Sequence, residues 1–307
     1  MAELEPEPEP EPSLAIVPFS ENMVFTNPRL LATRRFDLHG KTIVLEQQHQ
    51  KAAMASEWDA GGSLTGAAVW DASLVLAHYL PQLGSWRGRR VLELGAGAGL
   101  LAIACAQQGA AVTATDADER VLELCRANAA ANDAELATAL LLWGDAAALG
   151  SLDAGAGGGA AEDSAGGLEQ QGETGEGQQG QGQERQPPGW DWILAADCVY
   201  PGRRQDASGG ADKPLLATLR AACSLRPPSH TAAAERTQVL LGYKTRSAEQ
   251  LTFFALAKRA GFELDWVPQS SLHPDFQADG AADDPAECRG LAGGVHVCVM
   301  RLAAAIH

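Results

Sequence analysis

The stretch Val91-Leu92-Glu93-Leu94-Gly95-Ala96-Gly97-Ala98-Gly99 decides the fold of this chain. Residues 90–94 are typical of a buried strand, and residues 99–108 form an apolar helical run that ends at Gly109. When a strand ends in Gly-x-Gly-x-Gly and leads at once into a helix, backbone can approach a ligand closely, and the helix N–H groups face that ligand. The stretch alone indicates a site for a nucleoside-type ligand, with a tight turn that binds nothing as the alternative.

The same pattern of strands and helices continues on the carboxyl side. Strands are predicted at 111–115, 138–143, 190–197 and 237–243, helices at 118–131, 213–223 and 247–260, and two directly joined strands at 263–267 and 295–302. Such alternation is typical of βαβ units, which build a parallel sheet. We therefore predict an α/β fold whose mostly parallel sheet has about seven strands and ends in an antiparallel hairpin.

Two further elements are predicted before the glycine stretch. Residues 36–48 have the pattern of a hairpin that turns at His39-Gly40. Residues 66–80 place apolar side chains at helical spacing, and Pro81 should end that helix. The predicted domain therefore begins near residue 36.

Most of the negative charge lies in two segments outside this pattern. The chain has 307 residues and a net charge of −16, of which residues 1–12 carry −5 and residues 151–188 carry −6. The remainder carries only −5 and is a poor candidate for a nucleic-acid backbone, which needs clustered Lys and Arg. The two segments consist of Glu-Pro repeats and of Gly, Gln and Glu, so they cannot bury enough apolar surface to order. We predict a disordered acidic tail and lead-in (1–35), one domain (36–302) and a disordered insert within it (151–188).

The six cysteines show no paired spacing that would indicate a zinc site or a disulfide framework. Cys105 and Cys125 stand inside apolar runs, where we expect small core residues. No apolar run approaches the ~20 residues of a membrane span, and the Glu-Pro start is unlike a secretory signal. We expect a protein of a reducing compartment, in the cytoplasm or the nucleus, without metal or membrane.

The spacing of the glycines distinguishes between two cofactor classes. The dinucleotide fingerprint G-x-G-x-x-G would need a glycine where Leu100 stands. The spacing Glu-x-Gly-x-Gly-x-Gly instead resembles motif I of the class I methyltransferases, whose loop wraps the methionine end of S-adenosylmethionine. Asp116 ends the second strand, where an acidic side chain can accept hydrogen bonds from both ribose hydroxyls. A helix cap is the alternative for Asp116.

The third predicted strand ends Leu142-Trp143-Gly144-Asp145, at the edge where a class I fold holds the adenine. Trp143 could supply an apolar ring surface, and Asp145 could accept a hydrogen bond from the exocyclic amine. An ordinary core tryptophan and a loop-capping aspartate are the alternatives.

Four segments together resemble the seven-β-strand protein N-lysine methyltransferases, the methyltransferase-like proteins that modify chaperones and translation factors. The segments are Ile43-Val44-Leu45-Glu46-Gln47, Thr65-Gly66-Ala67-Ala68-Val69-Trp70-Asp71-Ala72, the glycine stretch from Glu93 to Gly99, and Ala196-Asp197-Cys198-Val199-Tyr200. The last matches that family's Asp-x-x-Tyr motif. A looser match is Tyr243-Lys244-Thr245-Arg246 with the aromatic residues that follow it. The resemblance covers residues 36–302.

The resemblance implies S-adenosylmethionine as cofactor and assigns roles to particular residues. Trp70 would pack on the cofactor, Glu93 and the backbone of Gly95, Ala96 and Gly97 would form its methionine site, and Asp116 would hold the ribose. Trp143, Asp145 and Ala196 would line the adenine and methionine walls, and Asp197 and Tyr200 would lie where the target amine enters.

The chemistry of methyl transfer is consistent with a carboxylate at Asp197. The apolar strand before it delivers the side chain to the carboxyl edge of the sheet, where ligands bind in open α/β folds. The nucleophile must be a neutral amine, although free lysine has a pKa of ~10.4. A carboxylate can orient that amine, while the sulfonium and desolvation lower its pKa. A loop-capping Asp197 and a packing Tyr200 are the alternatives.

We therefore predict an enzyme that transfers methyl from S-adenosylmethionine to a lysine of a protein substrate, such as a chaperone or translation factor. Methylation of a small molecule or nucleic acid is one alternative, although the Asn/Asp-Pro-Pro-Tyr/Phe tetrad of nucleic-acid amino-methylating enzymes is absent. A non-catalytic cofactor-binding interaction module is the other. The sequence does not fix the oligomeric state, for which we expect a monomer.

Overall fold

The computed structural model describes residues 28–48, 64–155, 189–199, 212–226, 236–277 and 294–303. Most of the predicted tail, residues 156–188 of the predicted insert, and Tyr200 lie outside these ranges. Within them, no helix has the length and apolar character needed to cross a membrane.

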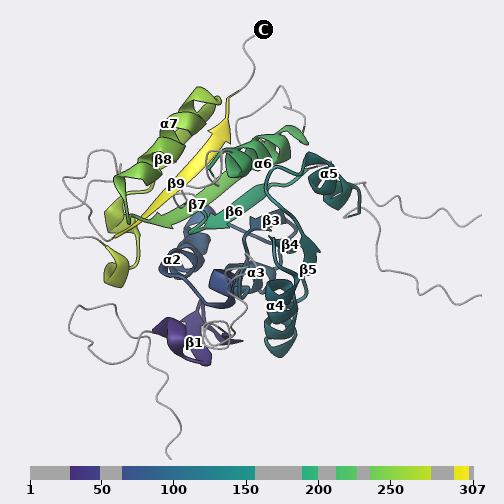
Figure 1. Ribbon diagram of the computed structural model, residues 1–307. Coiled ribbons are helices and arrows are strands. Elements are labelled where there is room, and N and C mark those ends of the chain that lie inside the picture. The colour runs from purple at the N-terminus through teal and green to yellow at the C-terminus, as the bar shows by residue number, and fades with distance from the viewer. Residues whose placement is uncertain are drawn as a thin grey trace, which may run out of the picture.

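A seven-stranded sheet forms the centre of the molecule (Figure 1). Its strand order is β5-β4-β3-β6-β7-β9-β8. The five strands from β5 to β7 in this order are parallel to one another, and β9 runs antiparallel between β7 and β8. The strands are β3 (Arg90–Leu94), β4 (Ala111–Asp116), β5 (Ala137–Leu140), β6 (Trp192–Ala196), β7 (Gln238–Lys244), β8 (Phe262–Trp266) and β9 (Val295–Leu302). This topology confirms the predicted class I methyltransferase fold and its terminal antiparallel hairpin.

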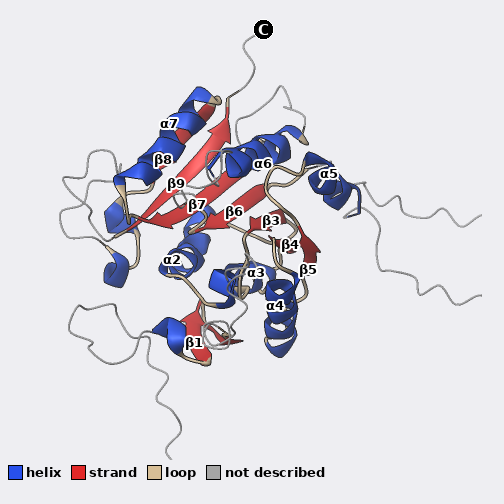
Figure 2. Ribbon diagram, in the orientation of Figure 1, coloured by secondary structure: helices blue, strands red, loops and turns tan. Residues whose placement is uncertain are grey.

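Helices cover both faces of the sheet, as Figure 2 shows. Helices α2, α3 and α4 pack on one face, and α5, α6 and α7 on the other. The helices are α2 (Asp71–Tyr79), α3 (Leu100–Ala106), α4 (Glu119–Ala131), α5 (Ala146–Gly155), α6 (Asp212–Ser224) and α7 (Leu251–Arg259). Short 3₁₀ helices are η1 (Pro28–Leu30), η3 (Leu64–Ala67), η4 (Leu80–Leu83), η6 (Ala248–Gln250), η7 (Gln269–Ser271) and η8 (Pro274–Phe276).

The inner strands β3, β6, β7 and β9 are apolar on both sides because each supplies residues to two cores. In β6, Trp192 and Leu194 enter the core beneath α2 and α3, whereas Ile193 and Ala195 enter the core beneath α6 and α7. This period of two is what a sheet covered on both faces requires. Cys105 and Cys125 lie buried in the first core, as predicted.

Three predicted boundaries are wrong. The helix predicted at 66–80 begins at Asp71, because the preceding residues form η3 and a short extended segment. The chain then passes through Pro81 as η4, since proline is tolerated at the start of a helical turn, where its missing N–H is not needed. The strand predicted at 138–143 ends at Leu140, which leaves Trp143 in a loop. Helix α5 reaches Gly155, so residues 151–155 are helical and do not belong to the insert.

A separate hairpin, β1 (Thr33–Leu38) and β2 (Lys41–Glu46), confirms the predicted turn at His39-Gly40. Its outer edge is bonded to side chains of α4. Asn132 exchanges two hydrogen bonds of 2.8 Å with the backbone of Val44, and Asn128 makes the same exchange with Glu46. Asn128 Nδ2 also donates to Ala98 O (2.9 Å), which ties the hairpin to the glycine loop.

Candidate active site

The predicted site residues gather at the carboxyl edge of the sheet, around the point where the strand order reverses between β3 and β6. The glycine loop follows β3, Asp116 ends β4, and Asp197 follows β6. In open α/β sheets the crevice for a ligand lies at this switch point. The fold therefore brings together three segments that are up to 100 residues apart in the sequence.

The glycine loop is held by close backbone contacts on both sides. Ala96 N donates to Thr115 O (2.8 Å), and Gly97 has a φ of +57°. A Cβ on Gly97 would lie 2.8 Å from Gly66 O, a distance that side chains do not tolerate. A Cβ on Gly95 would meet Cys198 Sγ at 3.1 Å and Trp143 Cζ2 at 3.5 Å. The segments that contain Gly66, Trp143 and Cys198 therefore all contact the glycine loop.

Asp116 binds the loop directly. Its Oδ2 accepts from Gly97 N (3.1 Å), and its Oδ1 accepts from Ala117 N (2.8 Å) and Asp118 N (3.3 Å). Burial raises the pKa of this carboxyl, although the backbone N–H groups oppose the rise. The cap of α4 is Asp118, whose side chain accepts from Arg120 N. The alternative of Asp116 as the helix cap is therefore wrong.

Glu93 lies beneath the loop and not on an open surface. It is 1% exposed, and it points toward α3, where its carboxyl accepts a hydrogen bond from the backbone of Ala102. Burial raises its pKa to about 8, and the nearby charge of Asp116 adds to the rise. Within the described residues Glu93 Oε2 has no hydrogen-bond partner. Its role toward a cofactor stays a prediction.

The two residues predicted for the adenine side have different surroundings. Trp143 is half-buried against Gly95. Asp145 is exposed, and its Oδ1 accepts from Ala148 N (2.9 Å), which is the contact of a cap at the start of α5. Ala196 ends β6 and is half-buried beside the site.

Trp70 lies immediately before α2, and two guanidinium groups pack against its ring. The Cζ atoms of Arg29 and Arg246 lie 4.2 Å and 5.2 Å from the centre of its ring. The backbone beside it is fixed by Gln47, whose Oε1 accepts from Val69 N (2.8 Å) and whose Nε2 donates to Leu31 O (2.8 Å). Sequence reasoning assigned no role to Gln47, although its segment is part of the resemblance.

Asp197 is held on its backbone and on both carboxylate oxygens. Its φ is +59°, a conformation that Asp tolerates better than most residues, and its N–H donates to Gly242 O (2.7 Å). Arg246 forms a bidentate pair with the carboxylate (2.7 and 2.5 Å), and Lys244 N donates to Oδ1 (3.2 Å). These bonds fit the alternative of a loop-holding aspartate, and contact with a target amine stays a prediction. The partner Arg246 was missed, because only the looser match included it.

A second charged cluster involves the first residue of α2. Asp71 Oδ2 accepts from Lys244 Nζ (2.8 Å) and Arg29 Nη2 (3.3 Å). Burial alone would raise the pKa of Asp71, but the bond and charge of Lys244, with Arg29 and Arg34, hold it below its ordinary value. Asp71 therefore remains a carboxylate beside Trp70.

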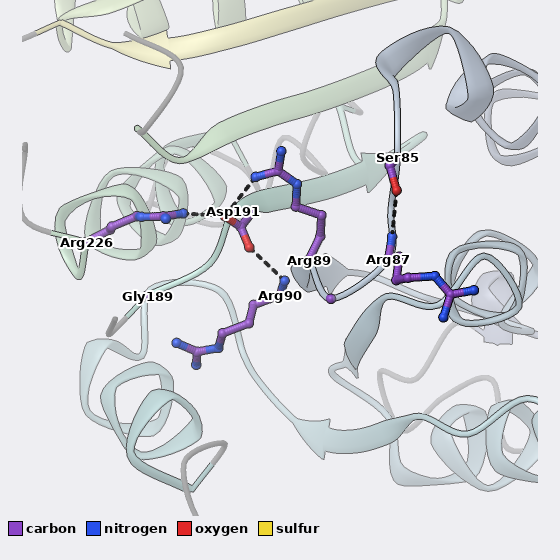
Figure 3. A pocket seen from close by; sticks show the side chains of 8 residues that line it. Ser85, Arg87, Arg89, Arg90, Gly189, Asp191 and Arg226 are labelled. Atoms are coloured by element: carbon purple, nitrogen blue, oxygen red, sulfur yellow. Dashed lines mark hydrogen bonds and ion pairs between the residues drawn. The ribbon is translucent and has the colours of Figure 1, made fainter. Parts of the chain in front are cut away.

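A cleft at the opposite edge of the sheet contains none of the predicted residues (Figure 3). Asp191 lies in it and accepts from Arg226 Nη1 (2.6 Å), Arg89 Nη1 (3.4 Å) and Arg90 N (2.8 Å). The side chains of Arg87 and Arg90 point away from Asp191 in different directions. Asp191 thus links the starts of β3 and β6 to the end of α6. These contacts stabilise the fold, and we assign the cleft a structural role.

Known proteins match the part of the chain that holds most of this site. Residues 48–152 match the family model described as lysine methyltransferase. Protein N-lysine methyltransferase METTL21A of Danio rerio is 37% identical over 117 residues, which cover 38% of this chain and 48% of the relative. EEF1A lysine methyltransferase 3 of Mus musculus is 50% identical over 58 residues, which cover 18% of this chain and 25% of the relative.

The matched part spans about half the length of the METTL21A relatives. Among solved structures, the T. thermophilus 16S rRNA N2 G1207 methyltransferase in complex with AdoMet and guanosine has a TM-score of 0.44 and 17% identity, covering 90% of this chain and 52% of that chain.

The strand order and the loop at its switch point define the class I methyltransferase fold. Within that class, the family match confirms the resemblance to the lysine methyltransferases over residues 48–152, which contain Trp70, the glycine loop and Asp116. The Asp-x-x-Tyr segment lies outside the match.

Proposed function

We propose that this chain transfers a methyl group from S-adenosylmethionine to a lysine side-chain amine of a protein substrate. The observation that carries the proposal is the meeting of the glycine loop, Asp116 and Asp197 at one sheet edge, in a chain whose residues 48–152 match the lysine methyltransferases.

The residues present fit the cofactor. The loop has no side chain at Gly95 or Gly97, so its backbone can lie against the methionine portion. Among the described residues, Asp116 Oδ2 accepts from Gly97 N alone, so this oxygen has a second acceptor position for a ribose hydroxyl. Trp143 offers a half-buried ring beside the loop. When bound, S-adenosylmethionine supplies an electrophilic methyl group on a sulfonium.

On the acceptor side the protein must orient an amine that has lost its proton. Asp197 is the carboxylate at the end of β6, and its backbone is fixed by the bond to Gly242 O. A carboxylate in that position can accept a hydrogen bond from the amine and direct its lone pair. The substrate we propose is a chaperone or a translation factor, and the relative whose name includes EEF1A supports the second.

Replacing Asp116 by Ala should weaken the binding of S-adenosylmethionine by about 10- to 100-fold, because a hydrogen bond to a charged acceptor is lost. Calorimetric titration of the purified variant measures this. Asp118→Ala is the matched control, since it removes a neighbouring carboxylate that caps α4, and its affinity should stay within about threefold of wild type. An Asp116→Ala chain that binds as tightly as wild type would exclude the ribose role.

The activity is tested by incubating the chain with cell lysate and methyl-labelled S-adenosylmethionine, followed by acid hydrolysis of the protein fraction. Recovery of labelled ε-N-methyllysine, strongly reduced with Asp116→Ala at a cofactor concentration below saturation, supports the proposal. Label in nucleic acid or small molecules would favour the alternative enzyme class. Cofactor binding without any transfer would favour a non-catalytic module.

A further inference from the structure

Arg246 and Asp197 form a bidentate ion pair, in which two guanidinium nitrogens donate to the two carboxylate oxygens. Nη1 bonds Oδ1 at 2.7 Å and Nη2 bonds Oδ2 at 2.5 Å. The Asp197 side chain is only 3% exposed, so its charge is shielded from water, whereas that of Arg246 is 37% exposed. In such a setting the charge of the guanidinium acts strongly on the carboxylate.

Both members of the pair are anchored by their own backbones. Arg246 N donates to Gln250 Oε1 (2.6 Å), and Gln250 Nε2 donates to Val199 O (2.7 Å), two residues beyond Asp197. Gln250 is 1% exposed. One buried amide therefore joins the segment after β7 to the segment after β6, and the pair is a fixed part of the site and not a mobile surface contact.

Arg246 is the side-chain cation that bonds Asp197 among the described residues, because the nearby cations Lys244 and Arg29 bond Asp71. From α2, Asp71 faces the pair but is itself bonded to Lys244 and Arg29. The charges of Asp116 and Glu93, together with that of Asp197, act on the thiol of Cys198, the residue next to Asp197. Burial lowers the pKa of Arg246, but the bond and charge of Asp197, with the charge of Asp71, outweigh it and raise that pKa. Arg246 thus stays charged throughout the working pH range.

We propose that Arg246 is a positioning residue that neutralises Asp197 and so lets the target lysine lose its proton at the sheet edge. This inference rests on the proposed function. An isolated carboxylate within ~4–6 Å stabilises a charged amine and raises its pKa by about 1–3 units, which opposes attack on the methyl group. The same carboxylate, paired with Arg246, can still accept a hydrogen bond but no longer favours the ammonium.

The hydrogen-bond capacity of Asp197 fits this role. A carboxylate has about four acceptor positions. Arg246 occupies one on each oxygen, and Lys244 N occupies the second position of Oδ1. Among the described residues, nothing else bonds Oδ2, so its second acceptor position is where we place the amine N–H.

The test is the pH profile of the Arg246→Gln chain. The substrate is total lysate protein, and the methyl donor is labelled S-adenosylmethionine. The initial rate of ε-N-methyllysine formation is measured for the variant and for wild type at each pH from 6.5 to 10, and the two profiles are compared. The pH of half-maximal rate should rise by about one unit or more, so the rate at pH 7 falls about tenfold and recovers toward pH 10.

Two further variants separate charge from shape. Arg246→Lys keeps the cation but loses the bidentate geometry, and its half-maximal pH should stay within about 0.3 units of wild type. Arg259→Gln, an exposed position at the far end of α7, should match wild type throughout. Cofactor affinity within about threefold of wild type shows that each variant is folded.

Three results would overturn the inference. A rate lowered by one constant factor at every pH would mean that Arg246 acts through shape alone. A rate at pH 7 above wild type would mean that Arg246 blocks the site as a competing cation. A wild-type chain that forms no methyllysine at any pH overturns the proposed function and this inference together, and is recognised before any variant is compared.

Discussion

Replacing Asp197 by Asn should lower the rate of methyl transfer about 100-fold and change the affinity for S-adenosylmethionine less than about threefold. The substitution keeps the shape of the side chain but removes its charge, and hydrogen bonds to charged groups contribute about 1.5–3 kcal/mol. The labelled-transfer assay measures the rate, and calorimetric titration measures the affinity.

Asp133→Asn is the matched control for this variant. Asp133 also has a positive φ, of 50°, but it is exposed in the loop after α4, away from the site. Its activity should equal that of wild type. If Asp197→Asn kept full activity, Asp197 would have no role on the acceptor side; if cofactor affinity fell as far as the rate, the residue would belong to the cofactor site.

In the wild-type chain we expect the free energy of unfolding to fall as the pH rises, because of Glu93. Replacing Glu93 by Gln should abolish this part of the fall. Burial raises the pKa of Glu93 from 4.5 to about 8, so the folded state binds a proton that the unfolded state releases between these values. The contribution of Glu93 to stability is therefore fully present below pH 4.5 and declines as the pH rises toward 8. The decline approaches about 5 kcal/mol over this range, at about 1.4 kcal/mol per pH unit.

Urea unfolding at pH 5 and pH 8 tests this prediction. The fall in unfolding free energy between the two values should be about 2–4 kcal/mol smaller in Glu93→Gln than in wild type. Glu123→Gln, on the exposed side of α4, should behave like wild type. The same pH dependence in wild type and Glu93→Gln would show that Glu93 is ionised in the folded protein.

Local patterns in the sequence predicted the elements that carry the site. The strand Arg90–Leu94 and the glycine loop follow from apolar composition and glycine spacing, and both are confirmed. Asp116 could be placed because it ends the next strand, where parallel strands present their carboxyl ends together. These predictions depend on residues that are close together in the sequence, and the periodicity of apolar residues indicates such local structure well.

The missed features depend on contacts between distant residues. Arg246 meets Asp197 across 49 positions, and Gln47 meets Val69 across 22. Nothing in the local pattern of either residue selects its partner. Helix α5 was not predicted at all, for another reason: Leu149 and Leu152 form an apolar stripe that packs on the second core, but the glycine-rich composition that follows masked it.

The amide side chains of α4 also decide what the hairpin can bind. The outer edge of a strand offers unpaired N–H and C=O groups, to which a strand of another molecule can add. Here Asn128 and Asn132 stand one helical turn apart, a rise of about 6 Å, and Val44 and Glu46 are two strand residues apart, about 6.6 Å. The two spacings are nearly equal, so the two amide side chains bond the backbone N–H and C=O groups of β2 that a neighbouring strand would otherwise bond. A strand of a second copy therefore cannot add to β2 at Val44 and Glu46, and a slip of β2 by one residue would break all four amide bonds at once.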